Sequence, residues 1–117
     1  MNILHIGIFK DHFLGGDIIL NKGFKKNGCT LTNFDYRDFS SIYGKNKMND
    51  AIKDYCNNID LVFIGKGEII NLETLKYINS KNIKISLWWG DQSKVHDKFM
   101  FDNLPYVDTF FSTTGGL

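Results

Sequence analysis

Short apolar runs alternate with stretches of helical spacing along this chain. Strands are expected at 2–8, 29–36, 60–65, 83–89 and 107–112, and helical spacing is found at 16–27, 48–56, 71–82 and 92–103. Two of the strand runs, Asp60–Gly65 and Ile83–Trp89, are almost wholly apolar, which is typical of strands covered on both faces. The polar segments 9–15 and 37–47 are predicted to be loops.

Two of the expected helices carry signals at their ends. Gly28 follows the first helix and is a natural C-terminal cap. Asn71 precedes the third helix, with Thr74 three residues on, and is expected to cap its N-terminus.

The alternation of strands and helices predicts an α/β fold. We expect a doubly wound, Rossmann- or flavodoxin-like, mostly parallel five-stranded sheet of order 2-1-3-4-5 with helices on both faces. With 117 residues, the chain is long enough for a single domain, 1–117. In this order the switch point lies between the first and third strands, with Phe9–Gly16 on one side and Lys66–Glu68 on the other.

Composition and charge exclude several function classes. The net charge of +1 and the scattered basic residues offer no attraction for nucleic acid or for an anionic membrane. No apolar run approaches the ~20 residues of a spanning helix, and 1–8 lacks the basic start of a signal peptide. We therefore expect a cytoplasmic protein with no nucleic-acid partner and no membrane span. Aromatic residues make up 15% of the chain, so part of this apolar surface is expected to face a neighbour.

The cysteines and histidines match no metal-binding pattern. Cys29 and Cys56 have no zinc or redox spacing and are expected to be buried thiols in a reducing compartment. The three histidines add no ligand spacing, so no metal site is predicted. His5 lies within an apolar strand and is expected to be a hydrogen-bonded core residue.

The loop before the first helix has two interpretations. Gly15 and Gly16 would leave backbone N–H groups free to meet an anion at a helix N-terminus, but the dinucleotide fingerprint G-x-G-x-x-G is absent. The same glycines also fit a turn that merely starts a helix. His12 is a candidate general base because its pKa lies near neutrality, and a solvated loop histidine is the alternative.

Further polar groups follow the third and fourth strands. Lys66 is suited to phosphate and Glu68 to sugar hydroxyls, and Gly67 would let the backbone approach a ligand; a tight turn with a surface ion pair fits equally. Trp88 and Trp89 point to opposite faces if the strand holds, so one of them is available to a ligand; we select Trp89. Asp91 is a candidate for contact with an acceptor hydroxyl, or else a helix N-cap.

Several segments taken together resemble a known family. They are Asn2–Gly7, Asp60–Gly67, Glu73–Leu75, Ile83–Asp91 and Val107–Thr113. This ordered set is similar to the N-terminal domain of a glycosyltransferase-like family that includes spore-maturation-type proteins. Where the family has an acid pair after the aromatic strand, this chain has Gly90 and Asp91.

The resemblance implies a GT-B type of enzyme, in which two Rossmann-like domains face each other across a cleft. Residues 1–117 would be the N-terminal, acceptor-side half of such a two-domain glycosyltransferase, truncated before its C-terminal domain. The nucleotide-sugar donor would bind mainly that C-terminal domain, with no tightly bound cofactor and no catalytic metal. The expected partners are the sugar nucleotide, the acceptor and the C-terminal domain, and the chain alone is expected to be inactive.

Roles follow for the candidate residues. His12 would deprotonate an acceptor hydroxyl, and the helix start at Gly15 and Gly16 would stabilise developing phosphate charge. The acceptor side would be formed by Lys66, Gly67, Glu68, Trp89 and Asp91. The alternative hypothesis is a stand-alone flavodoxin-like module that binds a ligand or a protein without catalysis, with its aromatic residues as the partner surface.

Overall fold

The structure, a computed structural model, describes residues 1–9, 16–89 and 104–112. Its strands are β1 (Asn2–Gly7), β2 (Thr30–Asp35), β3 (Leu61–Gly65), β4 (Lys84–Trp89) and β5 (Thr109–Ser112). Its helices are α1 (Gly16–Lys26), α2 (Tyr36–Tyr43), α3 (Lys45–Asp54) and α4 (Leu72–Ser80), with a short 3-10 turn, η1 (Leu104–Tyr106).

The strands form an all-parallel sheet. β1 lies between β2 and β3, and β4 pairs with the other edge of β3, which gives the order 2-1-3-4. The short β5 runs parallel beside β4. The predicted α/β class, parallel pairing and order of the first four strands are confirmed, and they are consistent with a Rossmann-like fold. The helix predicted at 92–103 lies outside the described residues.

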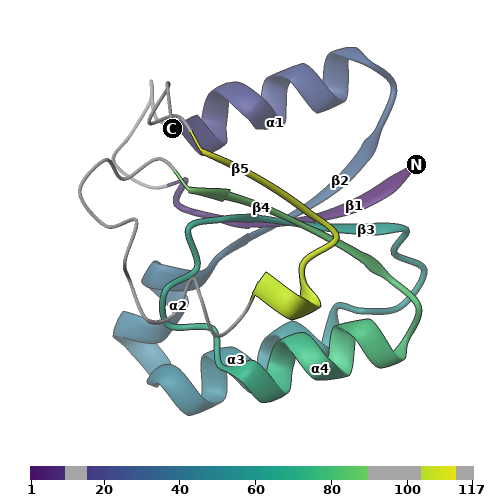
Figure 1. Cartoon of the computed structure of the whole chain (residues 1–117). Helices are drawn as coiled ribbons and strands as arrows, with labels where there is room; N and C mark the ends of the chain where they lie inside the picture. Colours follow the sequence, from purple (N-terminus) through teal and green to yellow (C-terminus); the bar gives the residue numbers. More distant parts are fainter. Residues whose placement is uncertain (10–15, 90–103, 113–117) are drawn as a thin grey trace.

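Helices cover both faces of the sheet. Among the described helices, Figure 1 shows α1 on one face and α2, α3, α4 and η1 on the other. The larger core lies on the face with α3 and α4, where apolar strand residues meet the buried faces of these helices. Its members include Leu4, Ile6, Val62, Ile64, Ile85 and Leu87 from the strands and Met48, Ile52, Leu75 and Ile78 from the helices.

The face under α1 is built from rings and polar groups. His5 of β1 is fully buried and stacks on Phe63 of β3, with ring centroids 5.1 Å apart and nearly parallel planes. Phe24 of α1 packs edge-on against Phe63, also at 5.1 Å. His5 also contacts Asp17 and Asn21 of α1 through its two ring nitrogens. The prediction of a hydrogen-bonded core histidine is confirmed.

The prediction of a loop at 37–47 is wrong, because most of this segment is helical. Asp35 caps α2 by accepting a hydrogen bond from the Asp38 N–H at 2.9 Å. Tyr36 and Phe39 lie one turn apart and pack on the core, while Gly44, with φ +95°, separates α2 from α3. The polar residues between the aromatics hid a helical spacing.

The predicted ends of α1 and α4 are confirmed. Gly28 has φ +84°, its N–H bonds to Lys25, and the Cys29 N–H bonds to Phe24, which together form a Schellman motif. Asn71 accepts from the Thr74 N–H at 3.0 Å and caps α4. Both thiols are free; Cys56 is buried as expected, whereas Cys29 is only half-buried.

Candidate functional site

The candidate site lies at the carboxyl edge of the sheet. β1, β2, β3 and β4 end at Gly7, Asp35, Gly65 and Trp89, and parallel strands bring these ends to one edge. Gly16 begins α1 at this edge, Lys66, Gly67 and Glu68 follow β3, and Trp89 ends β4, so the topology gathers five of the predicted site residues. His12, Gly15 and Asp91 lie outside the described residues.

Glu68 is the centre of a hydrogen-bonded cluster between the ends of β2 and β3. Its Oε2 accepts from the Tyr36 hydroxyl at 2.7 Å. Its Oε1 accepts from the Nε and Nη2 groups of Arg37 at 3.0 and 2.7 Å. Tyr36 is fully buried, whereas the Glu68 and Arg37 side chains are 26% and 46% exposed. The ion pair is therefore anchored by a buried phenol and open to solvent at its other side.

This cluster fixes the protonation of its members. Burial raises the pKa of the Tyr36 phenol, and the neighbouring charge of Glu68 raises it further, so Tyr36 remains a donor. Burial also raises the pKa of Glu68, but the hydrogen bonds from Tyr36, from its own backbone and from Arg37 outweigh this effect and lower the pKa. Glu68 is therefore an ionised carboxylate near neutral pH.

The backbone N–H groups of Lys66 and Gly67 connect the loop after β3 to β4 and to Tyr36. The Lys66 N–H donates to the Trp88 carbonyl at 2.7 Å, and the Gly67 N–H donates to the Tyr36 hydroxyl at 3.3 Å. Both residues have positive φ, +63° and +67°, a conformation that is rare for lysine and easy for glycine. Backbone outliers of this kind cluster at functional sites.

Asn49 of α3 holds the far end of the same loop. Its side chain donates to the Lys45 and Ile69 carbonyls at 3.0 and 3.2 Å. Its Oδ1 accepts from the Asn71 N–H at 2.9 Å and from the Thr74 hydroxyl at 2.8 Å. With Asn49 2% exposed, the loop 66–71 is fixed at both ends before any ligand arrives.

Trp88 lies on the face of the sheet that α1 covers. It is half-buried, and a Cβ built at Gly16 would overlap its ring. Only glycine fits at the start of α1, because the helix rests directly on the indole. The structure thus brings Gly16 and Trp88 together, a contact that the sequence alone did not predict.

The sequence analysis missed Asp17, which fills the switch point. Its carboxyl group accepts from the Ile8 N–H at 2.9 Å and contacts His5 Nε2 at 2.9 Å, and the residue is only 5% exposed. A Cβ at Gly7 would lie 2.5 Å from the Asp17 Cγ, and a Cβ at Gly65 would overlap its Oδ1. The signal in the sequence was an acidic residue in a first helical turn and a glycine ending each of two apolar strands.

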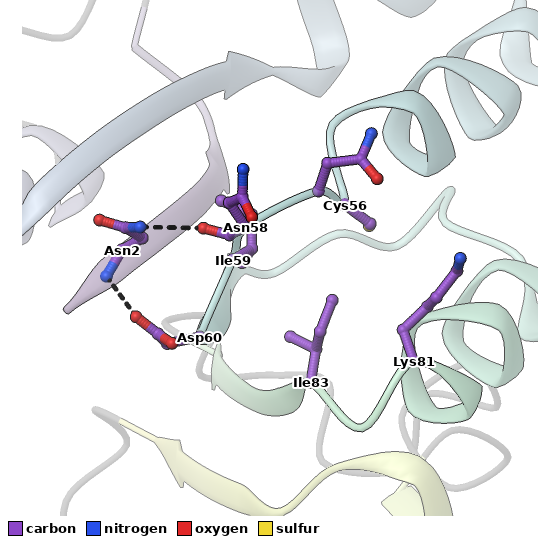
Figure 2. Close-up of a pocket in the computed structure, with 8 residues that line it drawn as sticks. Asn2, Cys56, Asn58, Ile59, Asp60, Lys81 and Ile83 are labelled. Atoms are coloured by element: carbon purple, nitrogen blue, oxygen red, sulfur yellow. Dashed lines mark hydrogen bonds between the residues drawn. The ribbon is translucent and has the colours of Figure 1, made fainter.

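A groove of 520 Å³ lies at the opposite, amino edge of the sheet. Figure 2 shows Asn2 there, joined to Asp60 and to the Asn58 backbone, with Lys81 and Ile83 on the far side. The Cys56 thiol at its wall donates to the Ile52 carbonyl, and burial raises its pKa, so the thiol is not activated. Ligands of open parallel sheets bind at the other edge, and we place the candidate site there.

Comparison with known proteins adds no relative. No family model matches the chain, and neither a curated protein nor a solved structure matches it. In the part of the chain that the structure describes, no helix is long and apolar enough to cross a membrane. The same residues contain no group of three or more histidine, cysteine or acidic side chains placed to hold a metal ion.

Proposed function

We propose that this chain is the acceptor-binding domain of a GT-B type glycosyltransferase, which transfers a sugar from a nucleotide-sugar donor to an acceptor hydroxyl. The observation that carries the proposal is the Arg37–Glu68 pair. It is ionised, half-open to solvent and held rigidly at the carboxyl edge of a parallel sheet. A fixed carboxylate and guanidinium supply acceptors and donors for several hydroxyl groups of one ligand.

The neighbouring residues support the same use. Gly67 brings its backbone N–H to the Tyr36 hydroxyl beside Glu68, and the half-buried indole of Trp88 supplies an apolar surface at the same edge of the sheet, on the face that α1 covers. A loop fixed by Tyr36 and Asn49 loses little freedom when a ligand binds. Under this proposal Lys66, Glu68 and Trp89 line the acceptor side with Asp91, and His12 is the general base.

Catalysis would require the second domain. A transferase of this type builds its site from two domains that close around both substrates. The acceptor half alone cannot hold the leaving diphosphate against a nucleophile. We therefore expect weak acceptor binding and no sugar transfer from residues 1–117 alone. Sustained turnover by this chain would contradict the proposal that the donor binds a second domain.

The test is an assay of the native gene product that contains this sequence, with a panel of nucleotide sugars. Glu68→Gln should lower kcat/KM for the acceptor by about tenfold or more, because a charge-assisted hydrogen bond is lost. Glu73→Gln is the matched control, since Glu73 is exposed on the first turn of α4. His12→Ala should abolish turnover, and unchanged turnover would remove His12 from the mechanism. A product that uses no nucleotide sugar would overturn the proposal.

A second candidate is a protein-interaction module without catalysis. The observation that favours it is a set of exposed apolar side chains at the ends of α2 and α3. Ile42, Tyr43 and Tyr55 are 63%, 55% and 44% exposed, and surface patches of this kind can mark interfaces. If Ile42→Ser with Tyr43→Ser abolishes co-purification of a partner while transferase activity is absent, the module hypothesis is favoured.

A further inference from the structure

The α1 N-terminus is where a doubly wound fold ordinarily binds phosphate. Free backbone N–H groups and the helix dipole favour an anion there. In this protein Asp17 already lies in that place, over Gly7 and Gly65 at the ends of β1 and β3. The room between these two strand ends is taken by a carboxyl group of the protein itself.

The hydrogen bonds of His5 indicate the state of Asp17. The Asn21 side-chain amide contacts His5 Nδ1 at 3.1 Å and Asn33 Oδ1 at 2.6 Å through one nitrogen. An amide nitrogen donates, so Nδ1 accepts and His5 Nε2–H is the donor to Asp17 Oδ1. Because the Ile8 N–H donates to the other oxygen, both oxygens of Asp17 act as acceptors, as in an ionised carboxylate.

Other backbone N–H groups of this edge are also occupied. The Ile8 and Phe9 N–H groups donate to Asp17 and Asp35, both at 2.9 Å. The Lys66 and Gly67 N–H groups donate to Trp88 and Tyr36. The backbone N–H groups after β1 and β3 that could bind a phosphate therefore already donate hydrogen bonds within the described fold.

The charged residues around this edge also disfavour the binding of an anion. The described residues that end β2, follow β3 or begin α1 and α2 carry four carboxylates and two cations: Asp17, Asp35, Asp38 and Glu68 against Arg37 and Lys66. Further along this edge, α3 begins with Lys45 and Lys47, and α4 has Glu73 in its first turn. Arg37 is paired with Glu68. The carboxylate at the helix N-terminus repels an anion where the dipole would otherwise attract one.

From these observations we infer that the carboxyl edge selects an uncharged, hydroxyl-bearing acceptor, such as a neutral saccharide, and rejects phosphorylated ligands. This inference rests on the proposed function and names the substrate class of the same site. Glu68 and Arg37 meet the hydroxyl groups, and Asp17 excludes phosphate from the switch point.

The test is an NMR titration of the full chain with two classes of probe. Methyl glycosides of glucose and N-acetylglucosamine should shift the Gly67 and Glu68 amides and the Trp88 indole at millimolar concentrations. Inorganic phosphate and uridine diphosphate should leave the Ile8, Gly16 and Gly67 amides unshifted over the same range. Phosphate or uridine diphosphate binding at equal or lower concentration would overturn the selectivity while leaving a ligand-binding edge in place. If no methyl glycoside shifts this edge, the inference is wrong whatever the anions do.

The variant Asp17→Asn tests whether the Asp17 carboxylate is what excludes phosphate from the switch point. Removing the carboxylate charge should raise phosphate affinity at the α1 N-terminus at least about fivefold, whereas Asp60→Asn, the same change at the amino edge, should not alter it. Unchanged phosphate binding in folded Asp17→Asn would contradict the role of Asp17, and if this variant does not fold, the wild-type comparison of the two probe classes still decides. In the native gene product, transfer to phosphorylated acceptors only would overturn this inference alone, whereas no transfer from any nucleotide sugar would overturn the proposed function.

Discussion

At the residue scale, this protein is organised by polar side chains that complete the hydrogen bonding of strand ends. Asp17 accepts from the backbone just after β1, and Asp35 both caps α2 and accepts from the Phe9 N–H. Glu68 holds Tyr36 and Arg37. Each carboxyl group satisfies donors that would otherwise be left at the edge of the sheet, and each requires space in which it can lie.

Gly65→Ala tests the packing of Asp17 against the strand ends. A new Cβ overlaps the Asp17 carboxyl group, which is buried and cannot move away freely, so we expect the free energy of unfolding to fall by about 1–3 kcal/mol. Gly23→Ala is the control. Apart from its chain neighbours and the backbone of its own helix, nothing lies within 4 Å of a Cβ at this position, so the helix should gain about 0.5–1 kcal/mol. Urea unfolding followed by tryptophan fluorescence measures both; equal effects of the two substitutions would refute the packing argument.

The lowered pKa of Glu68 makes stability depend on pH. A carboxyl group whose pKa is lower in the folded chain stabilises it above its ordinary pKa of 4.5, and this contribution is lost as pH falls through the folded pKa. The difference in unfolding free energy between wild type and Glu68→Gln should therefore be largest near neutral pH and shrink below roughly pH 4. Urea titrations from neutral to acid pH measure it, with Glu73→Gln as the exposed control. A difference that stays constant over the whole range would contradict the ionised cluster.

At the element scale, one buried asparagine joins α3, α4 and the loop after β3. Asn49 makes hydrogen bonds to Lys45, Ile69, Asn71 and Thr74, and these fix where α4 begins. The helix cap at Asn71 was predictable from local spacing, because a cap and its N–H partner are three residues apart. The role of Asn49 was not, since Asn71 and Thr74, whose groups it binds at the start of α4, lie 22 and 25 residues further along the chain.

Asn49→Ala should therefore lower the free energy of unfolding far more than a typical asparagine substitution does. It leaves the Asn71 N–H and the Ile69 carbonyl without this partner, and we expect a loss of about 2–3 kcal/mol in unfolding free energy. Asn46→Ala, at an exposed position of the same helix, should change stability by about 0.5 kcal/mol or less. Thermal and urea unfolding of both variants provide the measurement. A similar small effect for the two would show that the loop does not depend on Asn49.

At the scale of the whole molecule, the protection of backbone amides against hydrogen exchange is expected to fall from the centre of the sheet to its edge. β1 and β3 lie between other strands and are buried on both faces, whereas β2 is at the edge of the sheet. The Thr30 N–H bonds inward to Met1, so alternation along the strand directs the Leu31 and Asn33 N–H groups outward.

Amide hydrogen exchange tests this order. The amides of Leu4, Ile6 and Val62–Ile64 should exchange slowest, near the rate of global unfolding, and those of Leu31 and Asn33 should exchange much faster. The Thr30 amide, on the same edge strand but bonded inward, is the internal control. Slow exchange at Leu31 and Asn33 would indicate that another chain covers the edge of β2.

The sequence by itself determined the α/β class, the parallel order of the first four strands, the caps of α1 and α4, and the edge at which polar groups gather. Those features follow from short-range periods and from the handedness of crossovers, which nearest neighbours along the chain specify. Helix α2 was also predictable from the spacing of Tyr36, Phe39 and Tyr43, but the intervening serines and the glycine that follows the helix, Gly44, concealed it.

Only the tertiary structure decided the chemistry of the edge. It joined Glu68 to Tyr36 and Arg37 across about thirty residues, set Trp88 against Gly16, and placed Asp17 over Gly7 and Gly65. Such contacts depend on where parallel strand ends meet in space, and no local period encodes them. A glycine in the sequence allows a close approach, but only the fold shows that the approaching group is the protein's own carboxylate and not a ligand.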